Sequence, residues 1–305
     1  MSDLTEPGHA SQAAESGHES AGPVIDIVCN LFTPEVVAGR PPWTADFLGA
    51  KIGAPSRTLS GFTVEEHVAM LDEAGIDRAF LVAPKMGRVG LPASWRMDVR
   101  HVIDAVQARP DRFSGLVGID PYEGVRGTTE LARLVTEYGF VGAHCYPHWF
   151  ELAPDDRRYY PFYAKCVELD VPIQTQVGHC LRYSREQPLR SVGRPITLDT
   201  VACDLPDLKI IGIHVGWPWT EEMISVAYKH PNVYIGSDAY APKHWDPAFV
   251  RFIDSWGSDK VLFGTDWPVI DPVRARSEID GLDLRATSRA RLLGGNAAAL
   301  YRLEP

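Results

Sequence analysis

The stretch Val261-Leu-Phe-Gly-Thr-Asp-Trp-Pro268 begins with a short apolar run and ends in polar residues and a proline. Such a run, bounded by residues that favour turns, is typical of a buried strand in a parallel sheet. Seven similar runs precede it in the chain. The eight expected strands are residues 24–28, 78–83, 115–119, 140–146, 171–177, 209–214, 233–237 and 260–265. Eight strand–helix units predict an α/β protein with a closed (β/α)₈ fold, a TIM barrel.

Helix-like stretches separate most of these runs, as expected for parallel strands joined by helical crossovers. One of them has a clear start signal, because Thr63 and Glu66 have the spacing of a capping box. The expected helices are residues 63–74, 97–108, 127–137, 161–169, 220–230 and 247–256.

Composition and length are those of one globular domain. The 305 residues are 45% hydrophobic and 23% charged, which is enough apolar material for a barrel core. Residues 1–22 are rich in Ser, Ala, Glu, Gly and His and show no apolar periodicity. We therefore expect a flexible tail over residues 1–22 and a barrel domain over residues 23–305.

The charge of the chain limits its partners. A net charge of −10 argues against nucleic acid, whose phosphates attract basic patches. No apolar run reaches the roughly 20 residues that cross a bilayer, and the five cysteines form no Cys-x-x-Cys pair. We expect a cytoplasmic protein without disulfides that binds a small-molecule substrate and neither nucleic acid nor a membrane.

The connection after the first expected strand, residues 33–61, is unusually long and carries Pro41, Pro42 and Trp43. Connections of this length inside a compact domain are usually lids or binding elements. We expect this one to cover the mouth of the barrel.

Polar residues follow most of the expected strands. In a barrel of this type, residues at the carboxyl ends of the strands converge on the active site. The candidates at these positions are Asn30, Lys85, His144, Gln176, His179, His214, Asp238 and Asp266.

Several motifs occur in the order and spacing of a known family. The chain resembles the amidohydrolase-related family, which contains aminocarboxymuconate-semialdehyde and resorcylate decarboxylases, from residue 23 onward. The motifs that carry the resemblance are Ile25-Asp26, Leu31-Phe-Thr-Pro-Glu35, Val171-Pro-Ile-Gln-Thr-Gln-Val-Gly-His179, Ile213-His-Val-Gly216, Val261-Leu-Phe-Gly-Thr-Asp-Trp-Pro268 and Leu293-Gly-Gly-Asn-Ala-Ala-Ala-Leu-Tyr301.

The resemblance implies a His-x-His pair at positions 28 and 30, a metal-binding histidine at 176, a histidine at 214 and a catalytic or metal-binding aspartate at 266. This chain retains His214 and Asp266 but has Val28, Asn30 and Gln176 at the other three. Those three are poor zinc ligands, because zinc prefers imidazole, thiolate or carboxylate. We expect no cofactor, or a single divalent metal such as zinc. If a metal binds, its expected ligands are His144, His214 and Asp266.

Four residues are expected to carry catalysis. Asp266 is the candidate general base, because burial beside Trp267 would raise its pKa, although a structural cap is the alternative. His214 would polarise a carbonyl or exchange a proton, unless it is a structural core histidine. Asn30 and Gln176 would donate hydrogen bonds to a developing oxyanion, or are relics in an inactive barrel.

Substrate binding is expected at the mouth of the barrel. Basic side chains there would hold an anionic substrate, and tryptophans would pack against an aromatic or cyclic one. The expected substrate-binding residues are His144, His179, Lys85, Arg182, Trp217 and Trp267.

Three functions remain open. The first is hydrolysis of an activated amide, ester or lactone in a small cyclic or aromatic substrate, with or without metal, in which Asp266 activates water. The resemblance makes the metal-free version feasible, because the superfamily includes a metal-independent lactonase. The second is non-oxidative decarboxylation of a carboxylated aromatic or enal. The third is a barrel that only binds a small molecule, and the retention of His214 and Asp266 argues against it. By resemblance, we expect a homodimer.

Overall fold

The computed structural model describes residues 22–303. The predicted tail over residues 1–22 lies outside the described residues, except for its last residue. Eight parallel strands form one sheet with neighbours in the order β1-β2-β5-β6-β7-β8-β9-β10. Their bounds are β1 (Ile25–Asn30), β2 (Arg78–Ala83), β5 (Phe113–Ile119), β6 (Gly142–Cys145), β7 (Ile173–Gln176), β8 (Ile210–Ile213), β9 (Val233–Gly236) and β10 (Val261–Leu262).

The sheet closes between β1 and the segment that follows β10. The backbone N–H of Ile27 donates to the carbonyl of Phe263 at 3.0 Å, and that of Asp266 donates to Val28 at 2.9 Å. The buried carboxylate of Asp26 also accepts hydrogen bonds from the backbone and the hydroxyl of Thr265. These bonds join the first strand to the last, so the predicted (β/α)₈ barrel is confirmed.

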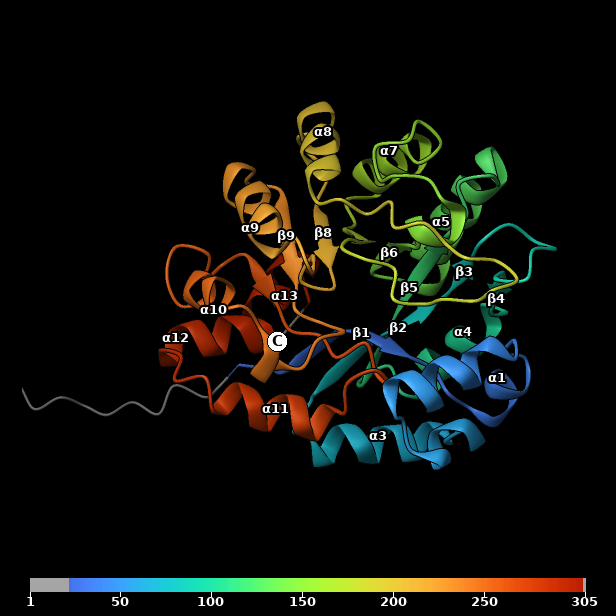
Figure 1. Ribbon diagram of the computed structural model, residues 1–305, viewed down its shortest axis with the longest axis horizontal. Coiled ribbons are helices and arrows are strands. Elements are labelled where there is room, and N and C mark those ends of the chain that lie inside the picture. Colours follow the sequence, from blue (N-terminus) through green and yellow to red (C-terminus); the bar gives the residue numbers. More distant parts are fainter. Residues whose placement is uncertain (1–21, 304–305) are drawn as a thin grey trace, which may run out of the picture.

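Helices surround the strands (Figure 1). The capping box predicted at Thr63 is present, because the side chains of Thr63 and Glu66 each bind the backbone N–H of the other. No helix among the described residues is long and apolar enough to cross a membrane. The main helices are α3 (Val64–Glu73), α4 (Arg100–Ala108), α5 (Gly124–Tyr138), α7 (Tyr160–Leu169), α8 (Ile196–Asp204), α9 (Thr220–Lys229), α10 (Pro247–Ile253), α11 (Pro272–Asp280), α12 (Ala286–Ala290) and α13 (Asn296–Tyr301).

Two apolar clusters form the core. The larger one lies between the strands and the surrounding helices. The smaller one joins Phe80, Leu116 and Ile211, which come from β2, β5 and β8, and includes Tyr301 of α13. Because β8 is separated from β2 and β5 by other strands of the sheet, contact between their side chains fills the interior of the barrel.

The long connection after β1 is mostly helical. It contains α1 (Pro34–Ala38), α2 (Trp43–Ala45), η1 (Asp46–Ile52) and η2 (Ser56–Ser60). Smaller elements elsewhere are the two-stranded ribbon β3 (Lys85–Met86) and β4 (Trp95–Arg96), α6 (Pro147–Phe150), η3 (Pro242–His244) and η4 (Arg291–Gly295).

Candidate active site

A cavity of about 150 Å³ lies where the carboxyl ends of the strands meet the long connection. Arg40, Trp43, Phe47 and Leu48 of that connection line it, as expected of an element that covers the mouth. Six of the site residues expected from the sequence also line the cavity: Asn30, Gln176, His179, Arg182, His214 and Asp266.

The backbone bends sharply where three strands end at this cavity. His214 has φ +69°, Ala239 has φ +66° and Asp266 has φ +52°, all in the left-handed region. A residue with a Cβ reaches that region at a cost of roughly 1–2 kcal/mol. Here the bend follows β8, β9 and the β10 segment and turns His214 and Asp266 toward the cavity, which both line.

His214, Asp238 and Asp266 form a compact cluster. Nε2 of His214 lies 3.3 Å from Oδ2 of Asp238 and 3.7 Å from Oδ2 of Asp266. The other oxygen of Asp238 accepts the backbone N–H of His214 at 3.1 Å. Within residues 22–303, neither Nε2 of His214 nor Oδ2 of Asp238 has a hydrogen-bond partner, although both atoms are buried. Buried polar groups normally have hydrogen-bond partners, so this pair of atoms, unsatisfied within the described residues, marks a place where a ligand or ion could bind.

Asn30 holds Asp266 in place. Its amide nitrogen donates to Oδ1 of Asp266 at 3.0 Å and to the carbonyl of Trp267 at 2.9 Å. The carbonyl can only accept, which fixes the orientation of the amide. In the sequence analysis, the amide of Asn30 was expected to donate hydrogen bonds to an oxyanion of the substrate. In the structure its two N–H groups are used by Asp266 and Trp267 instead, so Asn30 positions Asp266.

Burial controls protonation in the cluster. It raises the pKa of Asp266 well above its usual range, and the neighbouring Asp238 raises it further. It raises the pKa of Asp238 to about 7 and lowers the pKa of His214 to about 4. Burial and the neighbouring carboxyl group therefore favour the protonated form of Asp266, while the charge of Arg40 opposes this shift.

His144 lies beside this cluster but outside it. Its Nδ1 is 2.9 Å from Oε1 of Gln174, whose amide nitrogen donates to the carbonyl of Ile27 and to the hydroxyl of Tyr301. The amide orientation makes Nδ1 of His144 the donor and Nε2 a bare acceptor. Nε2 is buried without a partner in the described part of the chain, but His144 does not line the cavity.

Three other expected substrate-binding residues are not brought to the cavity. Lys85 is paired with Glu123 at 2.7 Å and with Glu130, both from the α5 region. Trp267 is buried and packs edge-on against His67 at 4.6 Å. Trp217 is 46% exposed. Ion pairing accounts for Lys85 and packing for Trp267, whereas Trp217 lies beside Tyr240, which lines the cavity, with 5.7 Å between their ring centroids.

Two arginines face the cavity without a carboxylate partner. The guanidinium of Arg40 lies between the rings of Phe32 and Trp95, at 3.8 and 4.2 Å from their centroids. That of Arg182 lies over Trp43 at 4.6 Å. In the described part of the chain, no carboxylate oxygen lies within 4.0 Å of either arginine. Burial lowers the pKa of Arg40 to about 9, although the nearby Tyr146 and Asp266 act in the opposite direction.

Asp238 was named in the sequence analysis as a strand-end candidate but was given no role, and Arg40 was not identified there. Asp238 follows an expected strand, so its position was a usable signal. Arg40 belongs to the long connection, and nothing in the sequence says which of its side chains turns inward.

The barrel, with an acid–base cluster at the carboxyl ends of its strands, defines a (β/α)₈ enzyme with its centre at the usual place. A model of the amidohydrolase family matches residues 51–303, so the chain belongs to the amidohydrolase family. The resemblance seen in the sequence is thereby confirmed.

The sequence identity to individual relatives is low. The chain is 26% identical over 290 residues to 2-keto-4-carboxy-3-hexenedioate hydratase of Sphingobium sp., a match that covers 78% of this chain and 82% of the hydratase. It is 24% identical over 292 residues to gamma-resorcylate decarboxylase of Rhodococcus jostii, covering 78% and 87%.

Solved structures support the fold. A TIM-barrel protein of Bordetella bronchiseptica matches with a TM-score of 0.73 at 23% identity, covering 92% of this chain and 98% of that protein. A dihydroxybenzoic acid decarboxylase of Polaromonas sp., with bound manganese and the inhibitor 2-nitroresorcinol, matches with a TM-score of 0.69 at 20% identity, covering 92% and 97%.

The residues present fit one divalent cation, but through a reduced ligand set. Val28 is packed in the barrel core, and the amide nitrogen of Asn30 is already engaged. What remains is Nε2 of His214 with one oxygen each of Asp238 and Asp266, all within 4.8 Å of one another. An imidazole and two carboxylates suit zinc or manganese. In this set Asp238 stands in the place that the sequence analysis gave to His144.

Proposed function

We propose that the protein is a lyase that removes, without oxidation, the carboxyl group of a small planar substrate. The observation that carries this proposal is the pair of arginines, Arg40 and Arg182, that face an aromatic-lined cavity without carboxylate partners. A buried charge without a partner is costly, so such a site favours an anionic ligand that supplies the partner. The names of the relatives favour decarboxylation over hydrolysis, which the sequence analysis had placed first.

The cavity walls suit a flat ligand. Trp43, Tyr146, Trp149 and Tyr240 line it, and their ring faces can pack against an aromatic or conjugated carbon skeleton. The two arginines would bind the carboxylate and a second anionic oxygen, such as a phenolate or another carboxylate. This arrangement holds the bond to be broken near His214 and Asp266.

The reaction needs one proton. The His214–Asp266 pair delivers it to the carbon that bears the carboxylate, the carbon–carbon bond breaks, and carbon dioxide leaves while the bonding electrons return to the planar system. Water then restores the proton to the pair. Asn30 keeps Asp266 in position through the bond at 3.0 Å. A divalent cation held by His214, Asp238 and Asp266 would polarise an anionic oxygen of the substrate; Nε2 of His214 would then be a ligand, and the proton would come from the carboxyl group of Asp266 alone.

A substrate panel tests the proposal. Purified protein, with and without added manganese or zinc, is incubated with hydroxybenzoates, carboxylated enals and unsaturated di- and tricarboxylates, and carbon dioxide is measured together with product mass. Release of carbon dioxide that is lost in His214→Gln supports a decarboxylase. Addition of water without carbon dioxide would assign hydration instead, and turnover of only uncharged esters or lactones would return the chain to the hydrolase hypothesis.

A further inference from the structure

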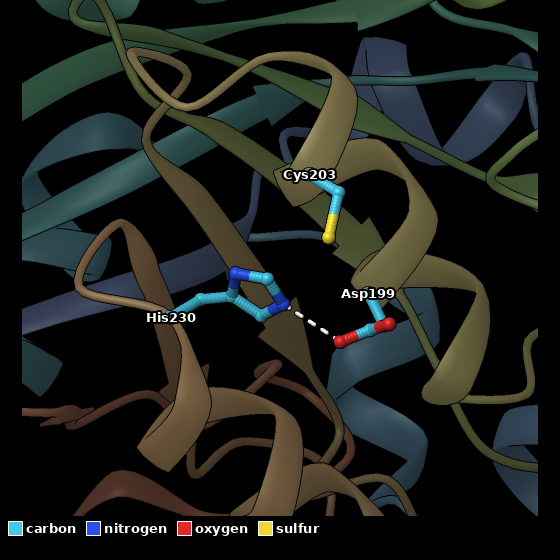
Figure 2. Close-up of side chains that lie close together, drawn as sticks. All are labelled: Asp199, Cys203 and His230. Atoms are coloured by element: carbon cyan, nitrogen blue, oxygen red, sulfur yellow. Dashed lines mark hydrogen bonds and ion pairs between the residues drawn. The ribbon is translucent and has the colours of Figure 1, made fainter.

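A second cluster of metal-binding residue types lies on the outer ring of helices, away from the cavity. Figure 2 shows Asp199 and Cys203 of α8 and His230, the residue that directly follows α9, with their side chains turned toward one another. One donor atom from each lies within 4.8 Å of the others. None of the three lines the cavity of the candidate active site.

The helix geometry explains the cluster. Asp199 and Cys203 are four residues apart on α8, so their side chains project from the same face. His230 is buried, and its Nε2 lies 2.7 Å from Oδ1 of Asp199. Cys203 is exposed, which leaves its thiol open to solvent. The three donors thus surround a point that a dissolved ion can reach.

A cation already occupies this point. Nζ of Lys229 lies 2.6 Å from Oδ1 of Asp199 and 3.9 Å from the sulfur of Cys203. Contact with Lys229 lowers the pKa of Asp199. The Lys229 side chain is 56% exposed, so it can leave for solvent when another cation takes its place.

We propose that Asp199, Cys203 and His230 bind a zinc ion, with water as the fourth ligand. Thiolate, imidazole and carboxylate are the three donor types that zinc uses in proteins. On binding, the thiol of Cys203 releases a proton to solvent, the ring proton of His230 moves from Nε2 to Nδ1 by exchange with water so that the imidazole stays neutral, and the Lys229 ammonium moves away. The ion would join α8 to α9 and so brace two neighbouring crossovers of the barrel. This inference does not rest on the proposed function.

Cobalt(II) is a suitable probe, because a cobalt–thiolate bond gives a charge-transfer band in the near ultraviolet. The His214–Asp238–Asp266 cluster contains no thiol, so cobalt bound there would not give the band. We expect the band in the wild-type protein and its loss in Cys203→Ser. The matched control is Cys180→Ser, which changes the other thiol that is not fully buried and should leave the band intact.

Two variants should change zinc affinity in opposite directions. The affinity is measured by competition with a chromogenic chelator, with manganese present to fill the barrel site. Cys203→Ser should weaken binding roughly 10-fold or more, because a ligand is lost. Lys229→Gln should tighten binding by roughly two- to fivefold, because the competing ammonium is removed. Zinc should also raise the melting temperature of the wild type by more than that of Cys203→Ser, in which only the barrel site can still bind zinc. Absence of the cobalt band, or equal zinc affinity in wild type and Cys203→Ser, would overturn the proposal and leave Asp199–His230 as a simple link between two helices.

Discussion

At the residue scale, the backbone conformations of His214 and Asp266 indicate, as their side chains do, that these residues have a functional role. Both have positive φ, a region that glycine adopts without penalty. A barrel that needed only the bend would be more stable with glycine there. The strain therefore indicates that the imidazole and the carboxyl group themselves are needed at these two points.

Replacement of Asp266 tests this directly. Asp266→Asn keeps the size of the side chain but cannot give or take a proton, so we expect kcat to fall by roughly 10²–10⁴-fold. The fold should persist, because the amide oxygen can still accept the hydrogen bond from Asn30. Turnover on the best substrate of the panel and circular dichroism are the measurements, with the exposed Asp207→Asn as control. Wild-type turnover in Asp266→Asn would remove this carboxyl group from the mechanism.

The arginines at the cavity lead to a separate prediction about the binding of an anionic substrate. Arg182→Gln removes a charge that no carboxylate of the described chain neutralises, so KM for an anionic substrate should rise by roughly 10- to 100-fold, since a charged hydrogen bond contributes about 1.5–3 kcal/mol. Arg185→Gln is the matched control, because Arg185 is exposed on the same loop. If both variants bind the substrate as tightly as the wild type, Arg182 is not part of the anion site.

The sequence correctly predicted residues of the cavity mainly where the end of a strand determined their position. Asn30 and Gln176 are the last residues of strands, His214 and Asp266 follow strands, and all four reach the cavity. Lys85 also follows a strand, yet the carboxylates of Glu123 and Glu130 hold it elsewhere. Those partners lie about 40 residues away in sequence, and no local pattern reports them.

At the element scale, all eight strands were predicted, because buried parallel strands read as short apolar runs. Their ends were less accurate. The last run was predicted over residues 260–265, but the ladder to β9 covers only Val261–Leu262, and Phe263 and Asp266 bond instead to other segments. The connection over residues 33–61 was read as a loop, although Pro41 and Pro42 also suit the first turn of a helix, and α2 follows them.

The capping box of α3 is the element whose contribution is simplest to measure. Thr63→Ala removes the acceptor for the backbone N–H of Glu66, and we expect a loss of about 1 kcal/mol in the free energy of unfolding. Thr63→Ser keeps the hydroxyl and should retain most of that stability. Urea unfolding of the three proteins provides the comparison, and equal losses in the two variants would mean that the methyl group, and not the cap, matters.

At the scale of the whole molecule, the barrel is closed by contacts between its first and last segments, and buried titratable groups lie along that closure. His67 of α3 is fully buried against Trp267, which follows β10, and neither ring nitrogen has a hydrogen-bond partner within residues 22–303. Desolvation lowers the pKa of His67 to about 4. The folded protein therefore keeps this imidazole neutral where an unfolded chain would protonate it.

This difference predicts how stability depends on pH. The pKa of histidine is about 6.5 in an unfolded chain and about 4 for His67 in the fold, so the unfolded state binds more protons between these values. The contribution of His67 to the free energy of unfolding is fully present above pH 6.5 and is lost as the pH falls toward 4, reaching a loss of about 2 kcal/mol at pH 5.

His67→Leu cannot titrate, so its free energy of unfolding should fall by about 2 kcal/mol less than that of the wild type between about pH 7.5 and pH 5. Comparing each protein with itself at two pH values cancels the packing change that the substitution causes, and it also cancels the other buried histidines, which titrate alike in both. An identical pH dependence in the two proteins would show that His67 is protonated within the fold, and the contact between α3 and the closing segment would then have to accommodate a charge.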